Sequence, residues 1–340
     1  YGIFLRMLVA VLVVGSETQR AKSRFGVGDF GIQPSEFAKG ATALALAKVL
    51  SSIDADFSKW RTKIASIFVI VVPMLLVFLQ NDTGSALVFA SFVFVLFREG
   101  LSAYVLVFGA ALIVLFVSAL LIDKYILVAI LFALCLVAWL VIKRKSHRTK
   151  VWLFLVCFLI SSAVVFAVDV VFDKGLEQHQ KDRIEVLLGK KEDLKGVGYN
   201  VNQSKIAIGS GGFLGKGFLN GTQTKYNFVP EQDTDFIFCT IGEEWGFIGS
   251  SITIILFLTL CIRLVKMAER QRSKFARIYG YGVASIIFFH FFVNIGMTIG
   301  LLPVIGIPLP FISYGGSSLW AFTLLLFIFI RQDASRLELI

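Results

Sequence analysis

Five carboxylates lie close together in one stretch of this sequence, where they could act as general bases, pair with a cation or complement a helix dipole. The stretch, residues 221–249, is rich in Gly and leads directly into a long apolar run. Which chemistry applies depends on the elements that position each carboxylate. The acidic residues are Glu231, Asp233, Asp235, Glu243 and Glu244.

The composition indicates a helical protein with many membrane-spanning segments. Of the 340 residues, 57% are apolar and only 16% are charged, and the mean hydropathy is +0.81. Soluble globular chains have roughly 45–50% apolar and about 25% charged residues. The net charge of +10 would suggest nucleic-acid binding in a soluble protein. In a membrane protein it indicates basic cytoplasmic loops, so we expect no nucleic-acid partner.

Ten apolar runs predict membrane-spanning helices, each of which needs roughly 20 residues. We expect an all-α polytopic integral membrane protein that forms a single membrane domain over residues 1–340. The chain opens inside an apolar segment with no basic stretch before it. This pattern does not fit a signal peptide and predicts that an N-terminal piece is missing. The predicted spans are 1–14, 36–53, 62–79, 83–97, 101–121, 124–142, 151–172, 236–263, 277–300 and 314–331.

The basic residues of the loops predict the orientation. The clusters KRKSHRTK (143–150) and RLVKMAERQRSK (263–274) fall on the same side when successive helices alternate, as the positive-inside rule requires. The large loop 173–235 then lies outside, and apolar faces within it predict short helices resting on the membrane surface. Shorter outer stretches are 15–35, 80–84 and 301–316.

The cysteines and histidines predict neither a disulfide framework nor a metal site. The four cysteines lie in or beside apolar runs without C-x-x-C spacing, so we interpret them as small apolar side chains. The three histidines are scattered along the chain.

Asp235 is the strongest candidate for chemistry in the acidic stretch. Asp233 and Thr234 resemble a helix N-cap, which would place Asp235 in the first turn of the helix that enters the membrane. Each of these acids could instead only complement the helix dipole. Glu243 and Glu244 lie two turns deeper. Because lipid does not tolerate an unpaired charge, at least one of them should face a polar cavity or a cation.

Two further polar groups lie at predicted helix starts on the outer side. Glu36 and Lys39, in the segment QPSEFAK (33–39), are one turn apart and can pair. They form either a structural buried ion pair or the polar lining of a cavity open to the outside. Asp82, in the QNDTG turn, leaves the same two alternatives.

Two outer segments are rich in Gly or Pro. GSGGFLGKGFLNG (209–221) allows tight turns and a close backbone approach to a ligand. PLPFISYGGSS (308–318) predicts a re-entrant or broken segment, which is tolerated only where protein or water covers it.

Basic residues also occur on the predicted outer side, where they are normally sparse. They predict either a solvated surface or an anion site, because clustered Arg and Lys side chains hold phosphates well. These residues are Arg20, Lys22, Arg24, Arg183 and Lys205.

Together these motifs resemble the SEDS family (shape, elongation, division and sporulation). GKGFLNGTQ followed by TDFIF favours the elongation branch of the family over the division branch. The similar segments follow the family order and are GIQPSEFAK (31–39), QNDTGSALV (80–88), NQSKIAIGSGGFLGKGFLNGTQTK (202–225), VPEQDTDFIF (229–238), GEEWGFIG (242–249) and NIGMTIGLLPVIGIPLPFISYGGSS (294–318).

The resemblance implies a SEDS fold and a peptidoglycan glycosyltransferase. Such an enzyme polymerises lipid II at the outer face of the bacterial cytoplasmic membrane during cell elongation and shape maintenance. The family's catalytic aspartate falls on Asp235, and residues 173–235 correspond to the large extracellular catalytic loop. The implied partners are a class B penicillin-binding protein that supplies the transpeptidase, lipid II with the growing glycan strand, and the elongation machinery.

We expect the remaining substrate contacts to come from polar residues of the same motifs. A divalent cation, Mg²⁺ or Mn²⁺, is expected to help the basic residues offset the pyrophosphate charge, with no ligands assigned, and no organic cofactor is expected. The candidate substrate-binding residues are Glu36, Lys39, Asp82, Arg24, Arg183, Gln203, Ser204, Lys205, Lys216, Thr234 and Ser313.

Three features depart from the family pattern. The family's first two spanning helices are absent, and Asp233 stands where a His-Thr-Asp motif is common. Residues 124–172 look like an extra helix pair. Because two added crossings return the chain to the same side of the membrane, the loop 173–235 stays outside.

Two other functions stay open. One is a lipid II flippase that uses the same cavity without bond formation, and the other is a scaffold that only activates its penicillin-binding partner.

Overall fold

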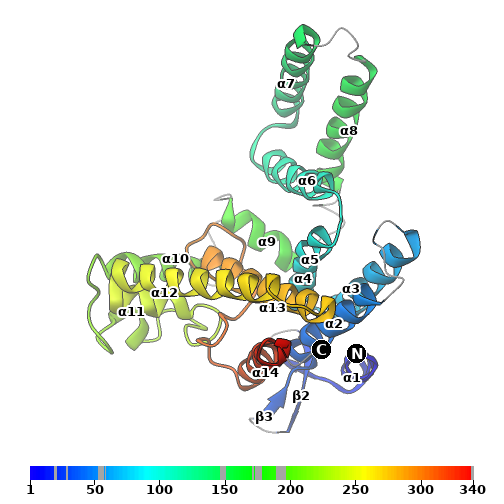
Figure 1. The fold of residues 1–340 in the computed structure, drawn as a ribbon. Helices are drawn as coiled ribbons and strands as arrows, with labels where there is room; N and C mark the ends of the chain where they lie inside the picture. The colour runs from blue at the N-terminus through cyan, green and yellow to red at the C-terminus, as the bar shows by residue number, and fades with distance from the viewer. Residues whose placement is uncertain are drawn as a thin grey trace. The chain divides into compact units, whose positions relative to one another are not determined.

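The computed structural model confirms the all-α fold class, and it describes residues 1–18, 21–27, 30–52, 57, 59–145, 151–170, 172, 178–188 and 197–337. Helices cover all ten predicted apolar runs apart from a few residues at their ends (Figure 1). These helices are α1 (Gly2–Val14), α2 (Pro34–Ser51), α3 (Trp60–Leu79), the continuous series α4 (Thr83–Val88), η1 (Phe89–Phe92) and α5 (Val93–Arg98), α6 (Ala103–Leu121), α7 (Lys124–Lys145), α8 (Val151–Val170), α12 (Ile237–Glu269), α13 (Lys274–Thr298) and α14 (Gly316–Ala334).

Five of the described helices are long and apolar enough to cross a membrane, namely α3, α6, α7, α12 and α13. Three shorter apolar helices lie at 2–14, 83–98 and 154–168. The helix α2 differs because it buries charged side chains among small apolar ones. Length and composition therefore indicate a multi-pass membrane protein.

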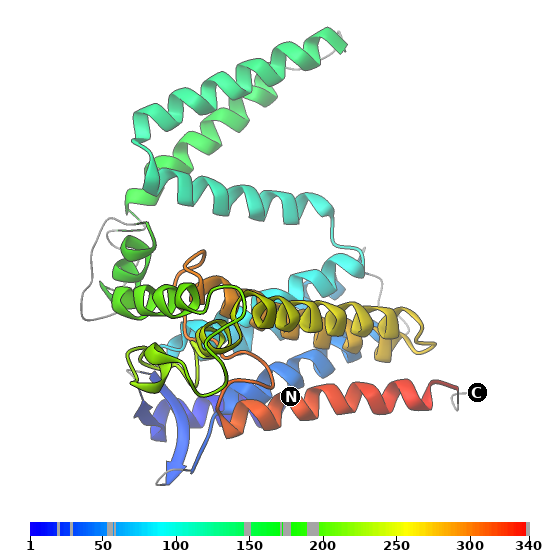
Figure 2. The same cartoon turned by 90° about the vertical axis from the view of Figure 1, so that its left-hand side faces the viewer.

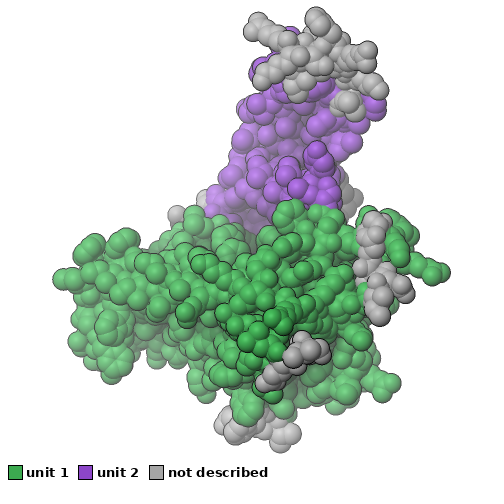
Figure 3. All heavy atoms as spheres, viewed as in Figure 1, with its two compact units in different colours: residues 1–101, 193–340 green, residues 102–192 purple. Residues whose placement is uncertain are grey.

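The chain forms two compact units, residues 1–101 with 193–340 and residues 102–192 (Figure 3). In the second unit α8 contacts both α7 and α6. This unit also holds α9 (Gln178–Leu187), which confirms one of the two short helices expected in the large loop. The proposal that 124–172 is an extra helix pair stays a prediction, and its basic connection at 146–150 lies outside the described residues.

The centre of the first unit is α13, which is buried along most of its length and packs against α12, α2 and α14. Small residues permit the close approach: a Cβ placed on Gly282 would lie 3.1 Å from the Cβ of Ala43 on α2. Ile286 of α13, Leu46 of α2 and Phe329 of α14 belong to the main apolar core between these helices. Such a rigid frame can position polar groups at its ends.

Ion pairs join the helix ends that were predicted to lie inside. The guanidinium of Arg98 lies 3.0 Å from Glu269 at the end of α12, and Arg277 of α13 lies 3.3 Å from Glu99. The end of α5 and the basic cluster 263–274, which was predicted to lie inside, are therefore at one end of the first unit, as alternating spans require.

The outer stretch 15–35 contains a small sheet that the sequence did not predict. Its strands are β1 (Ser16–Thr18), β2 (Ala21–Val27) and β3 (Phe30–Ile32), antiparallel and in the order β1-β2-β3. Two of the strands have three residues each, too few for a periodic pattern to be recognised.

The long helix α12 contains a kink that the sequence also did not predict. Gly246 has φ 62° and ψ −156°, which favours Gly because a Cβ there would lie 2.4 Å from the backbone nitrogen of Gly215. The loop 211–217 packs across the kink and replaces lost helical bonds. Phe247 N–H donates to the carbonyl of Gly212 at 2.9 Å, and Lys216 N–H donates to the carbonyl of Glu243 at 3.0 Å.

The segment between α13 and α14 contains no helix, which confirms the predicted break near 308–318. In Figure 2 this orange segment runs without helix to the start of the red helix α14. Two more short helices precede α12: α10 (Val197–Ser210), which confirms the second helix expected in the large loop, and α11 (Thr222–Lys225).

We predict that Gly246→Ala destabilises the first unit, because a side chain would strain the backbone and collide with the loop 211–217. The strained conformation alone should cost about 1–3 kcal/mol. Thermal unfolding of the purified protein in detergent measures the effect. Gly209→Ala on α10 is the matched control, because a Cβ there would meet nothing within 4 Å. Equal melting temperatures for the two variants would contradict the prediction.

Candidate active site

Asp235 lies in a series of turns just before α12, and the expectation that it occupies the first helical turn is wrong. The helix begins at Ile237 with Phe236 as its N-cap, and its first turn has no acidic residue. The expected cap by Asp233 and Thr234 is absent because the chain forms a local turn instead. The N–H groups of Thr234 and Phe236 donate to the carbonyl of Glu231 at 3.2 and 3.1 Å.

The buried amide of Asn294 holds this turn in place. Its Nδ2 donates to the carbonyl of Asp235 at 2.8 Å and to the carbonyl of Ile307 at 2.7 Å. It therefore joins the turn before α12 to the non-helical segment 299–315. The sequence analysis did not select Asn294, although an amide inside an apolar run is a signal that could have found it.

Two candidates from the sequence, Thr234 and Ser313, come together beside Asp235. The hydroxyl of Ser313 donates to the carbonyl of Thr234 at 2.6 Å and accepts from the N–H of Leu309 at 2.8 Å. The N–H of Tyr314 donates to the carbonyl of Asp233 at 2.8 Å. The backbone of this turn is therefore fastened at Asp233 and Thr234, directly before the catalytic candidate, and at Asp235 itself.

The carboxylate of Asp235 lies against a glycine of the non-helical segment 299–315. A Cβ on Gly306, which has φ +70°, would lie 3.2 Å from Oδ2 of Asp235. On the other side, a Cβ on Gly84 of α4 would lie 2.4 Å from the carbonyl oxygen of Ile305. Residues 305–306 thus lie between the start of α4 and the turn that carries Asp235. A side chain larger than that of Gly306 would collide with the carboxylate of Asp235.

Asp82 serves as the N-cap of α4, which favours the structural alternative. Its Oδ1 accepts from the N–H of Ser85 at 3.0 Å, and its Oδ2 accepts from Nε2 of Gln33 at 2.9 Å. The N–H of Gln33 in turn donates to Ser317 at the start of α14. These bonds bring the predicted outer stretches 15–35, 80–84 and 301–316 to one end of the unit.

The predicted pair of Glu36 and Lys39 forms, and it includes a third residue. Nζ of Lys39 lies 2.8 Å from Oε1 of Glu36 and 2.9 Å from Nε2 of His290, and all three side chains are buried. Nδ1 of His290 lies 3.0 Å from the carbonyl oxygen of Pro308. Because a carbonyl only accepts and an ammonium only donates, this geometry assigns a neutral His290 with its proton on Nδ1.

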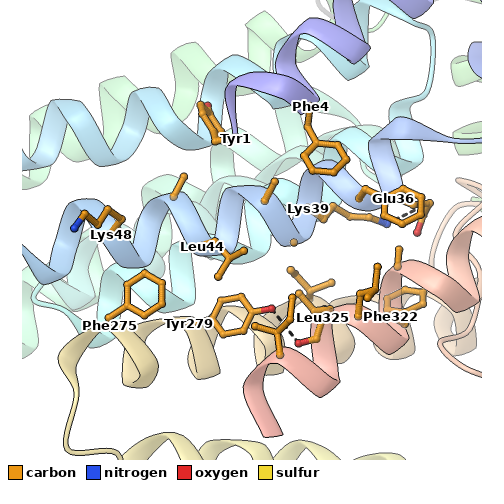
Figure 4. Close-up of a pocket in the computed structure, with 18 residues that line it drawn as sticks. Tyr1, Phe4, Glu36, Lys39, Leu44, Lys48, Phe275, Tyr279, Phe322 and Leu325 are labelled. Atoms are coloured by element: carbon orange, nitrogen blue, oxygen red, sulfur yellow. Dashed lines mark hydrogen bonds and ion pairs between the residues drawn. The ribbon is translucent and has the colours of Figure 1, made fainter. Parts of the chain in front are cut away.

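A cavity of about 540 Å³ lies beside this pair, between α1, α2, α13 and α14 (Figure 4). Most of its lining is apolar, including Phe322, and Figure 4 shows Glu36 and Lys39 toward one end and Lys48 toward the other. The pair is therefore a buried ion pair that also lines a cavity. This confirms the ion pair, whereas an opening of the cavity to the outside stays a prediction.

Glu243 confirms the expectation that a deeper carboxylate faces a cation. Its side chain is fully buried, and Oε1 lies 2.7 Å from Nζ of Lys216. Its Oε2 accepts from both the N–H and the hydroxyl of Thr224 at 2.9 Å. Lys216, expected to contact substrate, thus pairs with Glu243. Glu244 is also buried.

The other substrate candidates divide between the two units. On α10, Ser204 is buried and donates to the carbonyl of Thr298, Gln203 is half-buried, and Lys205 is exposed with its chain beside Gly300. Arg183 belongs to α9 in the second unit.

The predicted outer anion site stays a prediction. Arg24 lies on β2, but its side chain and the whole of Arg20 are outside the described residues. Within the part of the chain that the structure describes, no three His, Cys, Asp or Glu side chains form a group that could hold a metal ion. The donors described here therefore do not fit a site built by the protein alone.

The sequence profile of the FtsW/RodA/SpoVE family, described as cell cycle protein, matches residues 1–131 and 128–337. The chain belongs to this family. The two matched segments meet inside α7, in the region predicted to carry the extra helix pair.

Relatives and solved structures agree with this assignment. The peptidoglycan glycosyltransferase MrdB of Escherichia coli is 36% identical over 320 residues, which cover 94% of this chain and 72% of that protein. The peptidoglycan glycosyltransferase RodA of Treponema pallidum is 33% identical over 343 residues, covering 93% and 78%.

Among solved structures, a peptidoglycan synthase complex that coordinates polymerization and crosslinking contains a chain with a TM-score of 0.68 and 28% identity, covering 99% of this chain and 80% of that one. A crystal structure of an Asp-to-Ala mutant of the rod shape determining protein RodA from Thermus thermophilus gives a TM-score of 0.58 and 25% identity, covering 99% of this chain and 77% of that one. The names of these relatives support the elongation branch that the motifs favoured.

We predict that Lys39→Met destabilises the protein strongly, because it leaves the carboxylate of Glu36 buried without its cation. Removal of one partner of a buried pair typically costs about 3–5 kcal/mol. The double variant Glu36→Gln with Lys39→Met should recover part of the loss, since both charges are then absent. Melting temperatures of the two variants in detergent decide this, and a double variant less stable than Lys39→Met would contradict it.

Proposed function

We propose that this chain is a peptidoglycan glycosyltransferase that polymerises lipid II at the outer face of the cytoplasmic membrane, with Asp235 as the general base. The observation that carries the proposal is the backbone clamp around Asp235, formed by Asn294 and by Ser313. This clamp lies on the predicted outer segments, whereas ion pairs join the predicted inside ends. Relatives that cover most of the chain are named peptidoglycan glycosyltransferases.

In the proposed reaction, the 4-hydroxyl oxygen of the incoming lipid II attacks the anomeric carbon of the growing strand. The new glycosidic bond forms as the bond from that carbon to the pyrophosphate oxygen breaks. The leaving undecaprenyl pyrophosphate takes the bonding electrons, and the configuration at the anomeric carbon inverts. Asp235 accepts the hydroxyl proton, a role that requires the carboxylate within hydrogen-bond reach of the attacking oxygen.

The clamp supports this role because a general base works only in a fixed position. The turn before α12 is irregular and would otherwise be free to move. Asn294 and Ser313 fasten the carbonyls of Asp235 and Thr234 to other segments. The backbone that carries the carboxylate is therefore held by tertiary contacts rather than by the helix.

The negative charge that builds on the leaving pyrophosphate needs cationic partners. Lys205 is exposed near the start of the segment 299–315 and is our proposed contact within the first unit. We also propose that a divalent cation binds together with the substrate, because Mg²⁺ commonly uses one or two carboxylates and substrate phosphates. When bound, it would supply charge neutralisation at the pyrophosphate.

The proposal extends to partners and to the cell. A chain of similar fold occurs in a peptidoglycan synthase complex that coordinates polymerization and crosslinking. We propose a class B penicillin-binding protein as the transpeptidase partner of this chain, within the elongation machinery. The proposed location is the bacterial cytoplasmic membrane, with the active site facing outward.

We predict that Asp235→Asn lowers the polymerisation rate by roughly 10²–10⁴-fold, the usual contribution of a general base. Gel analysis of glycan strands made by the purified protein from lipid II measures this rate. Asp233→Asn, two residues away and exposed, is the matched control and should keep activity close to that of the wild type. An Asp235→Asn protein that polymerises at full rate would overturn the assignment.

Two further measurements separate the alternative functions from polymerisation. Purified chain that moves labelled lipid II across liposomes without making polymer would be a flippase. Polymer that forms only in the presence of the penicillin-binding partner, and equally well with the Asp235→Asn chain, would indicate a scaffold.

We predict that Asn294→Asp also lowers the polymerisation rate, by about tenfold or more. The isosteric carboxylate cannot donate to the carbonyls of Asp235 and Ile307, and an unsatisfied buried group costs about 1–3 kcal/mol. Asn202→Asp on the exposed face of α10 is the control for charge. If Asn294→Asp retains full activity, the amide does not position the base.

A further inference from the structure

The outer loop 211–219 presents large apolar side chains to its surroundings. Phe213 and Phe218 are each 66% exposed, Leu214 is 77% exposed and Leu219 is 64% exposed. Contiguous apolar patches of more than a few hundred Å² are rare on surfaces that face water. This loop therefore has the surface of a segment that contacts another apolar phase.

The loop continues the lipid-facing surface of α12. The ring of Phe213 stacks on Phe247 of α12, with centroids 5.7 Å apart and an angle of 18° between the rings. The ring of Phe218 packs on Trp245, with centroids 6.4 Å apart. Ile252 and Ile255 follow on the same helix and are also exposed. Because α12 is long and apolar enough to cross the membrane, the apolar surface passes from the lipid-facing helix to the loop without a break.

The backbone of the loop bonds to α12 where it crosses the kink. Across the kink, the N–H groups of Lys216 and Gly217 donate to the carbonyls of Glu243 and Glu244 at 3.0 and 2.9 Å. In the other direction Phe247 N–H donates to Gly212. Non-helical backbone is tolerated at membrane depth only when its polar groups have partners within the protein. These bonds meet that condition at the base of the loop, where Gly212, Lys216 and Gly217 bond to α12.

The single charge of the loop is neutralised in the same way. Lys216 is the charged residue in 211–219. Its Nζ lies 2.7 Å from Oε1 of the buried Glu243 and donates to the hydroxyl of Thr222 at 2.7 Å. A lysine in a loop bathed by water would need no such partner, whereas a lysine at the edge of the hydrocarbon does.

We propose that the loop 211–219 inserts into the outer leaflet of the membrane, with Trp245 and Phe247 at its base. The occupant of the exposed aromatic surface is lipid rather than another protein. Trp and other aromatic side chains are enriched at the level of the headgroups, which fits the position of Trp245 at the kink. The bonds across Gly246 tie the inserted loop to the part of α12 that directly follows the Asp235 turn. Insertion thus fixes the depth of that turn relative to the headgroups.

Spin labels test the insertion in liposomes of phosphatidylethanolamine and phosphatidylglycerol. In a background with the four native cysteines replaced by Ala, a nitroxide is attached to Phe218→Cys. Ile255→Cys, in the middle of α12, is the lipid-facing control, and Lys225→Cys, exposed on α11, is the water-facing control. We expect the Phe218 label to collide more with oxygen than with a water-soluble nickel chelate, as at Ile255. A label that favours the chelate, as at Lys225, would overturn the proposal.

A second measurement keeps the native cysteines. Tryptophan fluorescence is recorded in liposomes whose acyl chains are brominated near the carbonyl end, for the wild type and for Trp245→Phe. The difference between the two gives the signal of Trp245, and we expect the brominated lipid to quench it. A Trp245 signal unchanged by bromine would contradict insertion.

The spin-label experiment has one further outcome. If the Phe218 label becomes inaccessible to both oxygen and the nickel chelate only when a second protein is added, the surface belongs to that protein and the proposal is overturned.

Discussion

Lipid offers no hydrogen-bond partner, so each polar group that this fold carries into the membrane must be satisfied by another part of the protein. The structure supplies such partners at three places, and in the described residues Oε2 of Glu36 and Oδ1 of Asn294 are the atoms of these groups left without one. Glu36, Lys39 and His290 form one buried chain that ends on the carbonyl of Pro308. Asn294 satisfies two carbonyls of irregular segments. Glu243 accepts from Lys216 of the Gly-rich loop and from the N–H groups of Gln223 and Thr224 on α11.

The same bonds that satisfy buried groups also position the candidate base. His290 and Asn294 project from α13 and bind the carbonyls of Pro308 and Ile307, which are consecutive. The segment that holds Asp235 is therefore fastened to the most buried helix of the unit. Through Lys39, α2 is joined to the same point. A site near the membrane surface can in this way be as rigid as the core beneath it, which suits a reaction that depends on the position of one carboxylate.

The sequence predicts the spans well because length and hydropathy are local properties of the chain. It does not predict the kink at Gly246, since that conformation depends on the loop 211–217, about thirty residues earlier in the chain. The N-cap was placed wrongly at Asp233 because the local turn onto Glu231 competes with capping. Asn294 and His290 were missed because their partners lie on a segment whose path the sequence does not define. Asp235 was found because its motif is local and several motifs in order support it.

The central claim is that Asp235 removes a proton and does not merely hold the substrate. The most direct test measures, for the same Asp235→Asn protein in nanodiscs, the dissociation constant for lipid II and the single-turnover rate of the first glycosidic bond. The account predicts an affinity within about twofold of the wild type, because the clamp through Asn294 and Ser313 uses only backbone carbonyls, and a rate lower by at least roughly 100-fold. An affinity that falls in proportion to the rate, or a rate that does not fall, would contradict it.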